Sequence, residues 1–235
     1  MEHPSAQRLR IAIDTGTSVS ALLRAPDEAW AGYIFAHGAG AGMEHAFMAA
    51  FANGLAERGI ATLRYQFPYM ERGSRRPDAP VVAHAAVRAA VAEAALRLPG
   101  LPLFAGGKSF GGRMTSQAQA LQPLPGVRGL VFVGFPLHAA GKPSDERAQH
   151  LSDVGCPTLF LQGTRDELAE VERMQPVVQR LGERATLILF DDADHAFHVR
   201  ARSGRTDAGT LAAMVEATVA WVQAQVGPAA GRPLG

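Results

Sequence analysis

The sequence predicts an α/β fold in which helices cover both faces of a mostly parallel, twisted sheet. Segments of strand length alternate with segments of helical periodicity along most of the chain. These strand segments are apolar throughout, which is typical of strands buried between two layers of helices. With 235 residues, 47% of them hydrophobic, the chain is long and apolar enough for a core of its own. We expect one domain over residues 1–226 and a disordered Gly/Pro-rich tail over residues 227–235.

Two short strands, Leu9–Ile13 and Val19–Arg24, are expected first, because turn-prone residues separate them. The next strand, Ala31–Ala36, leads into a glycine-rich loop. Ligands bind at the carboxyl ends of the strands in such sheets, so the residues that follow each strand are the candidates for chemistry. The remaining elements expected are, in chain order, helix Glu44–Arg58, strand Ile60–Tyr65, helix Ala79–Leu98, strand Leu103–Gly107, helix Gly111–Leu121, strand Val127–Gly134, strand Pro157–Gly163, helix Glu167–Leu181, strand Ala185–Asp191 and helix Asp207–Val226.

Composition and charge favour a small-molecule partner over a polymer or a membrane. The net charge is +1 and no segment carries a block of like charge, so nothing indicates a nucleic-acid partner. No apolar run is long enough to cross a bilayer, and the first ten residues lack the apolar stretch of a signal peptide. Cys156 is the one cysteine, so no intramolecular disulfide can form, and we expect it to be a buried core residue. These features predict a cytoplasmic protein.

The strongest motif is a G-x-S-x-G sequence, Gly107-Lys108-Ser109-Phe110-Gly111, between an expected strand and an expected helix. A serine at such a sharp turn has a strained backbone, and close packing leaves no room for side chains at the flanking positions. The helix that follows directs the positive end of its dipole at the serine, where negative charge develops during acyl transfer. Ser109 is therefore the candidate nucleophile.

A serine hydroxyl needs a base, and the base needs an orienting acid. His195 follows the last expected strand and is the candidate base. Asp166 follows the strand Pro157–Gly163 and is the candidate acid, and it would also suit the N-cap of the next helix. Asp192 and Asp194 are alternatives for the acid, although they are so near His195 in sequence that we expect them to shape its loop. The order Ser…Asp…His is the one that this kind of fold requires.

Two backbone N–H groups are needed to stabilise an oxyanion. The residue after the nucleophile, Phe110, is expected to supply one of them. The loop His37-Gly38-Ala39-Gly40 follows the third strand and its small residues allow close approach, so the N–H of Ala39 is the second candidate. We expect His37 to have a structural role in holding this loop.

Six segments in order, HGAGAGMEH, RYQFPYMERG, GGKSFGGRM, GFPLHAAGKP, LQGTRDEL and DADHAF, resemble the α/β-hydrolase superfamily, and more closely a bacterial group similar to dienelactone hydrolases. The resemblance covers about residues 9–226. It implies hydrolysis of an ester or related acyl bond without a cofactor. Dienelactone hydrolases use a cysteine nucleophile, whereas this chain has Ser109. Many relatives insert a helical cap where this chain has only Phe135–Cys156, so we expect a minimal cap and an open pocket.

Three other interpretations of these residues compete with catalysis by serine. A phosphate-binding loop requires G-x-x-x-x-G-K-[ST], and here the first position of that pattern is Pro102. A metal site near His195 and His198 would need three or four converging ligands, so we expect no metal. A non-catalytic domain that mediates protein interactions is the main alternative, because one eukaryotic relative of this group is a subunit of a histone acetyltransferase complex.

The expected substrate is a small to medium carboxylic ester or thioester, and the oligomeric state is not indicated. Cationic residues, Arg113 and Lys142 among them, gather at the same sheet edge as Ser109, and four cationic or titratable residues there are the candidates for binding an anionic substrate. The alternative is a solvated loop whose arginines pair with nearby carboxylates. The four candidates are Lys108, Arg75, Arg76 and His138.

Overall fold

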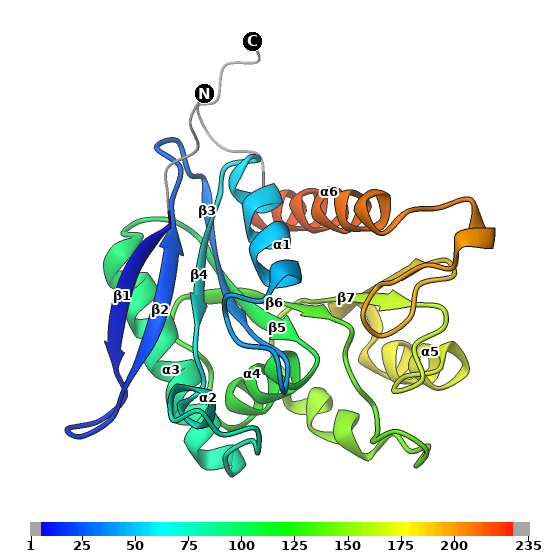
Figure 1. Ribbon diagram of the computed structural model, residues 1–235, viewed down its shortest axis with the longest axis horizontal. Helices are drawn as coiled ribbons and strands as arrows, with labels where there is room; N and C mark the ends of the chain where they lie inside the picture. The colour runs from blue at the N-terminus through cyan, green and yellow to red at the C-terminus, as the bar shows by residue number, and fades with distance from the viewer. Residues whose placement is uncertain (1–5, 228–235) are drawn as a thin grey trace.

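A computed structural model describes residues 6–227, and it contains one eight-stranded sheet (Figure 1). The strand order is β1-β2-β4-β3-β5-β6-β7-β8. Strand β2 is antiparallel to both of its neighbours, and the six strands that follow it in this order, including β3, are parallel to one another. The predicted mostly parallel sheet is therefore confirmed. The strands are β1 Gln7–Ala12, β2 Ser18–Arg24, β3 Ala31–Ala36, β4 Ile60–Tyr65, β5 Leu103–Lys108, β6 Val127–Val133, β7 Thr158–Gly163 and β8 Ala185–Phe190.

Helices cover both faces of this sheet, and two separate apolar clusters form the core. Helices α1 and α6 belong to the cluster on one face, and α3, α4 and α5 to the cluster on the other (Figure 1). The helices are α1 Ala46–Ala56, α2 Pro68–Glu71, α3 Pro80–Arg97, α4 Phe110–Leu121, α5 Val171–Leu181 and α6 Asp207–Val226, with short 3₁₀ helices η1 Glu146–Asp153, η2 Gly182–Arg184 and η3 Ala201–Ser203.

Strand β3 shows why the central strands are apolar at every position. All six of its residues are buried. Tyr33 and Phe35 belong to the cluster with α1 and α6, whereas Ile34 and Ala36 belong to the cluster with α3 and α4. Successive side chains of a strand point to opposite faces, so a strand between two helical layers needs apolar residues at both parities.

Most predicted elements are confirmed to within two residues, and the exceptions have local causes. The helix predicted from Glu167 begins only at Val171, with Glu170 as its N-cap residue, so the predicted capping role of Asp166 is wrong. Helix α2 was not predicted, because four residues are too few to show helical periodicity. The 3₁₀ helix η1 lies in the segment expected to hold at most a minimal cap.

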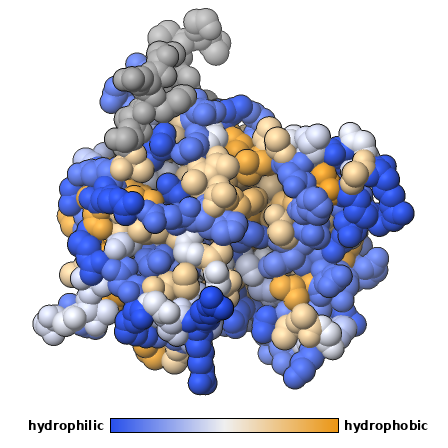
Figure 2. All heavy atoms as spheres, in the orientation of Figure 1, coloured by the Kyte–Doolittle hydropathy of each residue, from blue (hydrophilic) through white to orange (hydrophobic). Residues whose placement is uncertain are grey.

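Cys156 is only partly buried at the edge of the core, which corrects the expectation of a fully buried residue. Burial nevertheless raises the pKa of its thiol to about 11. The tail expected to be disordered lies, apart from Gly227, outside the described residues. No helix within residues 6–227 has the length and apolar character needed to span a membrane. The face of the molecule in Figure 2 is mostly hydrophilic, with its hydrophobic residues in small areas among the polar ones.

Candidate active site

Ser109 lies at the turn between β5 and α4, where its backbone has a φ of +50°. This left-handed conformation is strained for a residue with a side chain and projects the hydroxyl from the turn. Close packing against β3 explains the two glycines that flank it. A Cβ atom at Gly107 or at Gly111 would lie 2.5 Å from the carbonyl oxygen of Ala36, so neither position accepts a side chain.

The structure brings Ser109, His195 and Asp166 together in one hydrogen-bonded chain. The Oγ atom of Ser109 lies 2.8 Å from Nε2 of His195. On the other side of the ring, Nδ1 of His195 lies 2.7 Å from Oδ2 of Asp166. The three residues follow β5, β8 and β7, so their proximity is a consequence of the parallel sheet, whose carboxyl ends meet at one edge.

Asp166 is held in place from both of its carboxylate oxygens. Its side chain is fully buried, whereas the His195 side chain is 26% exposed. Oδ2 also accepts a hydrogen bond from Nε2 of Gln162, and Oδ1 accepts one from the N–H of Leu168 at 2.8 Å. Gln162 in turn accepts from the N–H of Phe135 at 3.0 Å. Buried polar groups need such partners, so this network fixes the carboxylate in one orientation toward the histidine.

Gln162 was not singled out from the sequence, although a signal for it exists. It is a fully buried amide near the carboxyl end of β7, in a strand whose preceding three residues are apolar. A buried side-chain amide must have hydrogen-bond partners, and its position four residues before Asp166 places it at the same sheet edge.

The two alternative acids have other partners. Asp192 pairs with Arg200, and its hydrogen bond from that guanidinium lowers the pKa of the carboxyl. Asp194 accepts from the backbone N–H groups of Ala196 and His198 at 2.8 and 3.0 Å. The carboxylate of Asp194 therefore shapes the loop around His195, as expected.

The loop after β3 lies beside the serine, and His37 holds it there. The imidazole is fully buried, its Nδ1–H donates to the carbonyl of Gly38 at 2.8 Å, and its Nε2 accepts from the N–H of Phe67 at 3.0 Å. Burial lowers the pKa of His37 to about 4, so the ring is neutral at physiological pH. A neutral ring has one donor and one acceptor, which is the pattern observed here, so His37 has a structural role.

A cavity of about 370 Å³ opens next to the serine. Both predicted oxyanion residues are at its wall, together with cationic and apolar side chains. It is lined by Ala39, Pro77, Asp78, Pro80, Ser109, Phe110, Arg113, Met114, Pro136, Arg147 and Leu168. Its size suits a small acyl chain.

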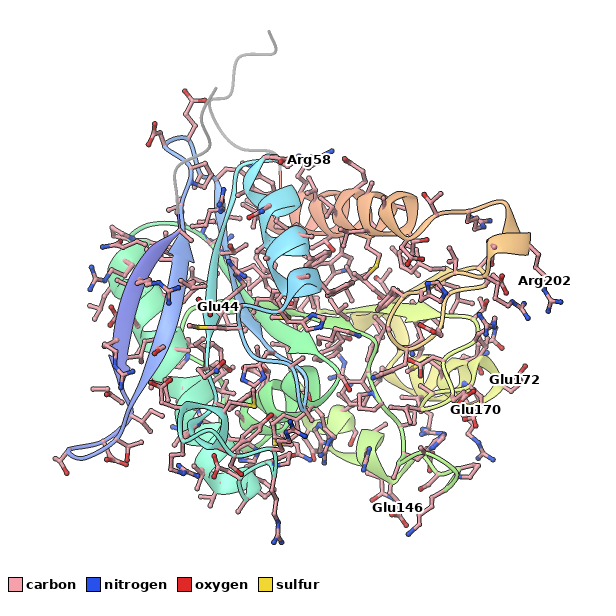
Figure 3. The ribbon with its side chains drawn as sticks, viewed as in Figure 1. Glu44, Arg58, Glu146, Glu170, Glu172 and Arg202 are labelled. Atoms are coloured by element: carbon pink, nitrogen blue, oxygen red, sulfur yellow. The ribbon has the colours of Figure 1, made fainter. Side chains whose placement is uncertain are left out.

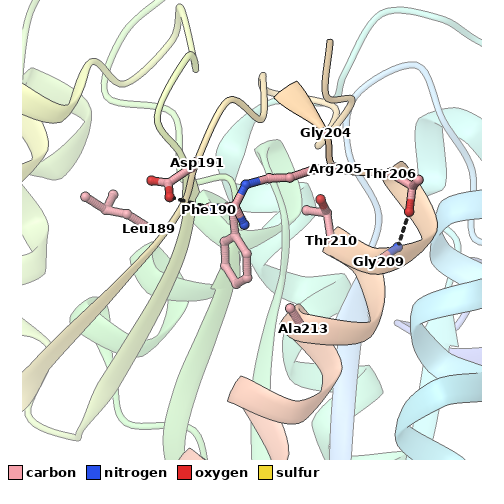
Figure 4. A pocket seen from close by; sticks show the side chains of 9 residues that line it. All are labelled: Leu189, Phe190, Asp191, Gly204, Arg205, Thr206, Gly209, Thr210 and Ala213. Atoms are coloured by element: carbon pink, nitrogen blue, oxygen red, sulfur yellow. Dashed lines mark hydrogen bonds and ion pairs between the residues drawn. The ribbon is translucent and has the colours of Figure 1, made fainter. Parts of the chain in front are cut away.

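A larger cavity, of about 500 Å³, lies between the end of β8 and the start of α6 (Figure 4). Arg205 crosses it to form an ion pair with Asp191 at 2.9 Å. Ser109, Asp166 and His195 are not among its lining residues. We therefore assign the smaller cavity to the candidate active site, because it is the one that contains the serine.

None of the four residues predicted to bind substrate lines the cavity beside Ser109. Arg75 and Arg76 are exposed in the loop after α2. His138 is buried, and its Nε2 lies 2.7 Å from the carboxylate of Glu170, which stands at the start of α5 (Figure 3). The cations that do line the cavity are Arg113 and Arg147.

Lys108, the fourth of these residues, contacts the histidine loop instead. Its Nζ donates to the carbonyl oxygen of His195 at 2.7 Å. The ammonium also lies 5.2 Å from the ring centroid of Phe47 and 5.1 Å from that of Phe197. Burial lowers the pKa of Lys108 to about 8, and the carboxylates of Asp166 and Asp194 oppose this shift. The side chain thus ties the residue before the nucleophile to the histidine.

Within residues 6–227, no group of three or more His, Cys, Asp and Glu side chains is arranged to hold a metal ion. The two histidines considered as ligands have other partners. His195 contacts Ser109 and Asp166, and Nδ1 of His198 lies 2.8 Å from Oδ2 of Asp207 on the surface.

An eight-stranded sheet with a serine at the strand-to-helix turn after β5 defines the class of α/β-hydrolase folds. Residues 30–223 match the family model described as an alpha/beta hydrolase domain, and the chain therefore belongs to this family. The predicted α/β-hydrolase fold is confirmed.

Several solved structures share this fold. A dienelactone hydrolase from Anabaena variabilis is 20% identical, with a TM-score of 0.76 over 94% of this chain and 97% of that chain. An alpha-beta serine hydrolase homologue from Coxiella burnetii is 20% identical, with a TM-score of 0.74 over 95% of this chain and 100% of that chain. A serine hydrolase without lid from Xanthomonas campestris is 19% identical, with a TM-score of 0.72 over 98% of this chain and 99% of that chain.

Proposed function

We propose that the protein is a serine hydrolase that cleaves a carboxylic ester or thioester of a small to medium substrate. The observation that carries this proposal is the continuous chain of hydrogen bonds from Asp166 through His195 to Ser109. Packing alone does not require a strained serine, a histidine and a buried carboxylate in this order. Membership of the hydrolase family supports the same activity, and so does the esterase domain from a Rhodothermus marinus protein among the similar structures.

The geometry suggests how each group acts. Nε2 of His195 takes the proton of Ser109 as Oγ attacks the acyl carbon, and Asp166 stabilises the imidazolium that forms. The N–H groups of Phe110 and Ala39 stabilise the oxyanion. The imidazolium then gives its proton to the leaving oxygen or sulfur, which leaves an acyl group on Ser109. A water molecule, deprotonated by His195, hydrolyses this intermediate and restores the free serine.

The test is covalent labelling by a fluorophosphonate probe, followed by mass spectrometry of the labelled peptide. We expect one label, on Ser109, because only an activated serine reacts rapidly with such a probe. Ser116 provides a matched control, because its Oγ lies 2.7 Å from Nε2 of His150. Burial lowers the pKa of His150 to about 4, which makes it a poor base, so we expect the Ser116→Ala variant to label like the wild type.

Absence of labelling in the folded wild-type protein, together with no hydrolysis of a panel of p-nitrophenyl esters and thioesters, would favour the alternative function. In that alternative, the chain is a non-catalytic interaction domain with a hydrolase fold.

We predict that Lys108 acts as a positioning residue for His195. Replacing Lys108 with methionine keeps the apolar stem and removes the hydrogen bond to the His195 carbonyl, so kcat should fall about tenfold with little change in KM. Lys108→Arg should restore part of the lost kcat.

The Lys108 ammonium loses its proton as the pH rises through about 8, so the wild-type kcat should decline above that pH. Loss of this decline in Lys108→Met is the readout that a purely structural role would not produce.

A further inference from the structure

Two arginines share the cavity with the nucleophile and come from different parts of the chain. Arg113 lies in the first turn of α4, where its N–H donates to the carbonyl of Ser109 at 3.1 Å. Arg147 lies in η1, in the segment between β6 and β7. Both line the cavity together with Ser109 and the two candidate oxyanion residues. The wall of the cavity is therefore positively charged close to the serine.

Neither guanidinium forms an ion pair with a carboxylate of residues 6–227. Nη1 of Arg147 donates to the carbonyl of His138 at 2.8 Å, and the buried Nε of Arg113 has no hydrogen-bond partner. The guanidinium of Arg113 lies against the ring of Phe110, at 5.8 Å from its centroid. Burial, and then the charge of Arg147, lowers the pKa of Arg113. The two like charges are thus near enough to repel each other.

One carboxylate, that of Asp78, also lines this cavity, but its oxygens already have partners. Oδ2 accepts from the N–H of Tyr69 at 2.7 Å, and Oδ1 pairs with Arg72 at 2.5 Å. Its charge is therefore balanced by Arg72. The positive charges of Arg113 and Arg147 have no carboxylate partner within residues 6–227, so the cavity is suited to an anion.

The lining of the cavity indicates which part of an ester it would hold. His195 must protonate the leaving oxygen or sulfur, so the leaving group has to lie beside the imidazole. His195 is not among the residues that line the cavity, whereas Ser109, Ala39 and Phe110 are. The cavity therefore accommodates the acyl part of the substrate. One turn of α4 separates Ser109 from Arg113, about 6 Å along the helix axis, which a roughly five-carbon acyl chain would span.

We propose that Arg113 and Arg147 bind a carboxylate at the far end of the acyl group, so that the substrates are monoesters or monothioesters of short dicarboxylic acids. The products are then the dicarboxylic acid and the free alcohol or thiol. This inference rests on the proposed hydrolase function. A guanidinium recognises a carboxylate through charge-assisted, bidentate hydrogen bonds, and the unpartnered Nε of Arg113 supplies one such donor.

The test compares the 4-nitrophenyl monoester of glutaric acid with its neutral primary-amide analogue, after subtraction of spontaneous hydrolysis. We expect the wild-type kcat/KM to be about tenfold or more higher for the anionic ester at low salt, because the contact is charge-assisted. This ratio should fall as salt is raised. The Arg113→Met and Arg147→Met variants should each lower the ratio, and the double variant should bring it close to one.

Arg128→Met is the matched control. Arg128 is exposed near the amino end of β6, whereas Ser109 lies at the carboxyl ends of the strands. Its replacement therefore changes the net charge as much as either single cavity variant does, without touching the cavity. We expect this variant to keep the wild-type ratio. If the double variant does not fold, inhibition of the wild type provides a second measurement, in which glutarate should inhibit hydrolysis of the neutral ester more strongly than glutaramide.

Equal kcat/KM values for the two esters in the wild type would overturn the inference and leave the hydrolase function intact. A preference that survives in a folded double variant would also overturn it. Hydrolysis of neither ester above the rate of Ser109→Ala would instead contradict the proposed function itself, so the two failures are distinguishable.

Discussion

Ser109→Ala is expected to lower kcat for ester hydrolysis by about four to six orders of magnitude. The reason is that the variant loses the atom that forms the acyl intermediate, while the cavity and the candidate oxyanion donors remain. Within residues 6–227, the Ser109 side chain hydrogen-bonds only to His195, so the removal of its hydroxyl should leave the fold intact. The measurement is kcat on the best p-nitrophenyl ester, with circular dichroism to show that the variant is folded.

A further loss on adding His195→Ala to Ser109→Ala should be small, because the base has no proton to take from an alanine. The residues of such a triad act as a unit, and their effects are not additive. A folded Ser109→Ala variant that keeps most of its activity would exclude the serine as nucleophile.

The second large effect is expected for Asp166→Asn, which should reduce kcat by about 10⁴-fold. The amide keeps the shape of the side chain but removes the negative charge 2.7 Å from Nδ1 of His195. Without that charge, the imidazolium that forms during acylation is not stabilised and the ring is no longer held in the tautomer that accepts the Ser109 proton. The network of Gln162 and Leu168 around the carboxylate should keep the variant folded.

Asp192→Asn is the matched control for this prediction, because Asp192 is close to His195 in sequence but pairs with Arg200 instead of the histidine. Asparagine tolerates the positive φ of this position, +59°, so the substitution should cause little strain. We expect kcat to stay within a factor of about three of the wild type. A larger loss of kcat in Asp192→Asn than in Asp166→Asn would show that Asp166 is not the acid that orients His195.

The order of the elements and the three candidate catalytic positions follow from the sequence for a common reason. In a parallel sheet every strand delivers the residue after it to the same edge, so the position of Ser109, Asp166 and His195 after β5, β7 and β8 is enough to bring them together. The local motif around Ser109 adds the glycines that its turn requires. The placement of the three residues after their strands and the glycines around Ser109 can both be recognised in the sequence.

The predicted beginning of α5 is wrong, because residues 167–170 have the sequence ELAE, whose residue types all favour a helix and are compatible with a first helical turn. In the folded protein, Asp166 is instead held by His195, Gln162 and the N–H of Leu168. Its carboxylate can satisfy the backbone of a turn or of a helix start equally well, so local sequence does not distinguish the two. Only the contact with His195, 29 residues away, does.

The sequence by itself determined the fold class, the strand order along the chain and the edge of the sheet where chemistry is expected. The tertiary structure alone decided which of the cations at this edge line the cavity beside the serine. Lys108 is next to Ser109 in sequence yet contacts the His195 carbonyl, whereas Arg147, 38 positions away, lines the cavity. A backbone position fixes where a side chain starts, but its direction depends on neighbours from distant segments, here Phe47 and Phe197 around Lys108. Contacts of that kind leave no periodic pattern in the sequence.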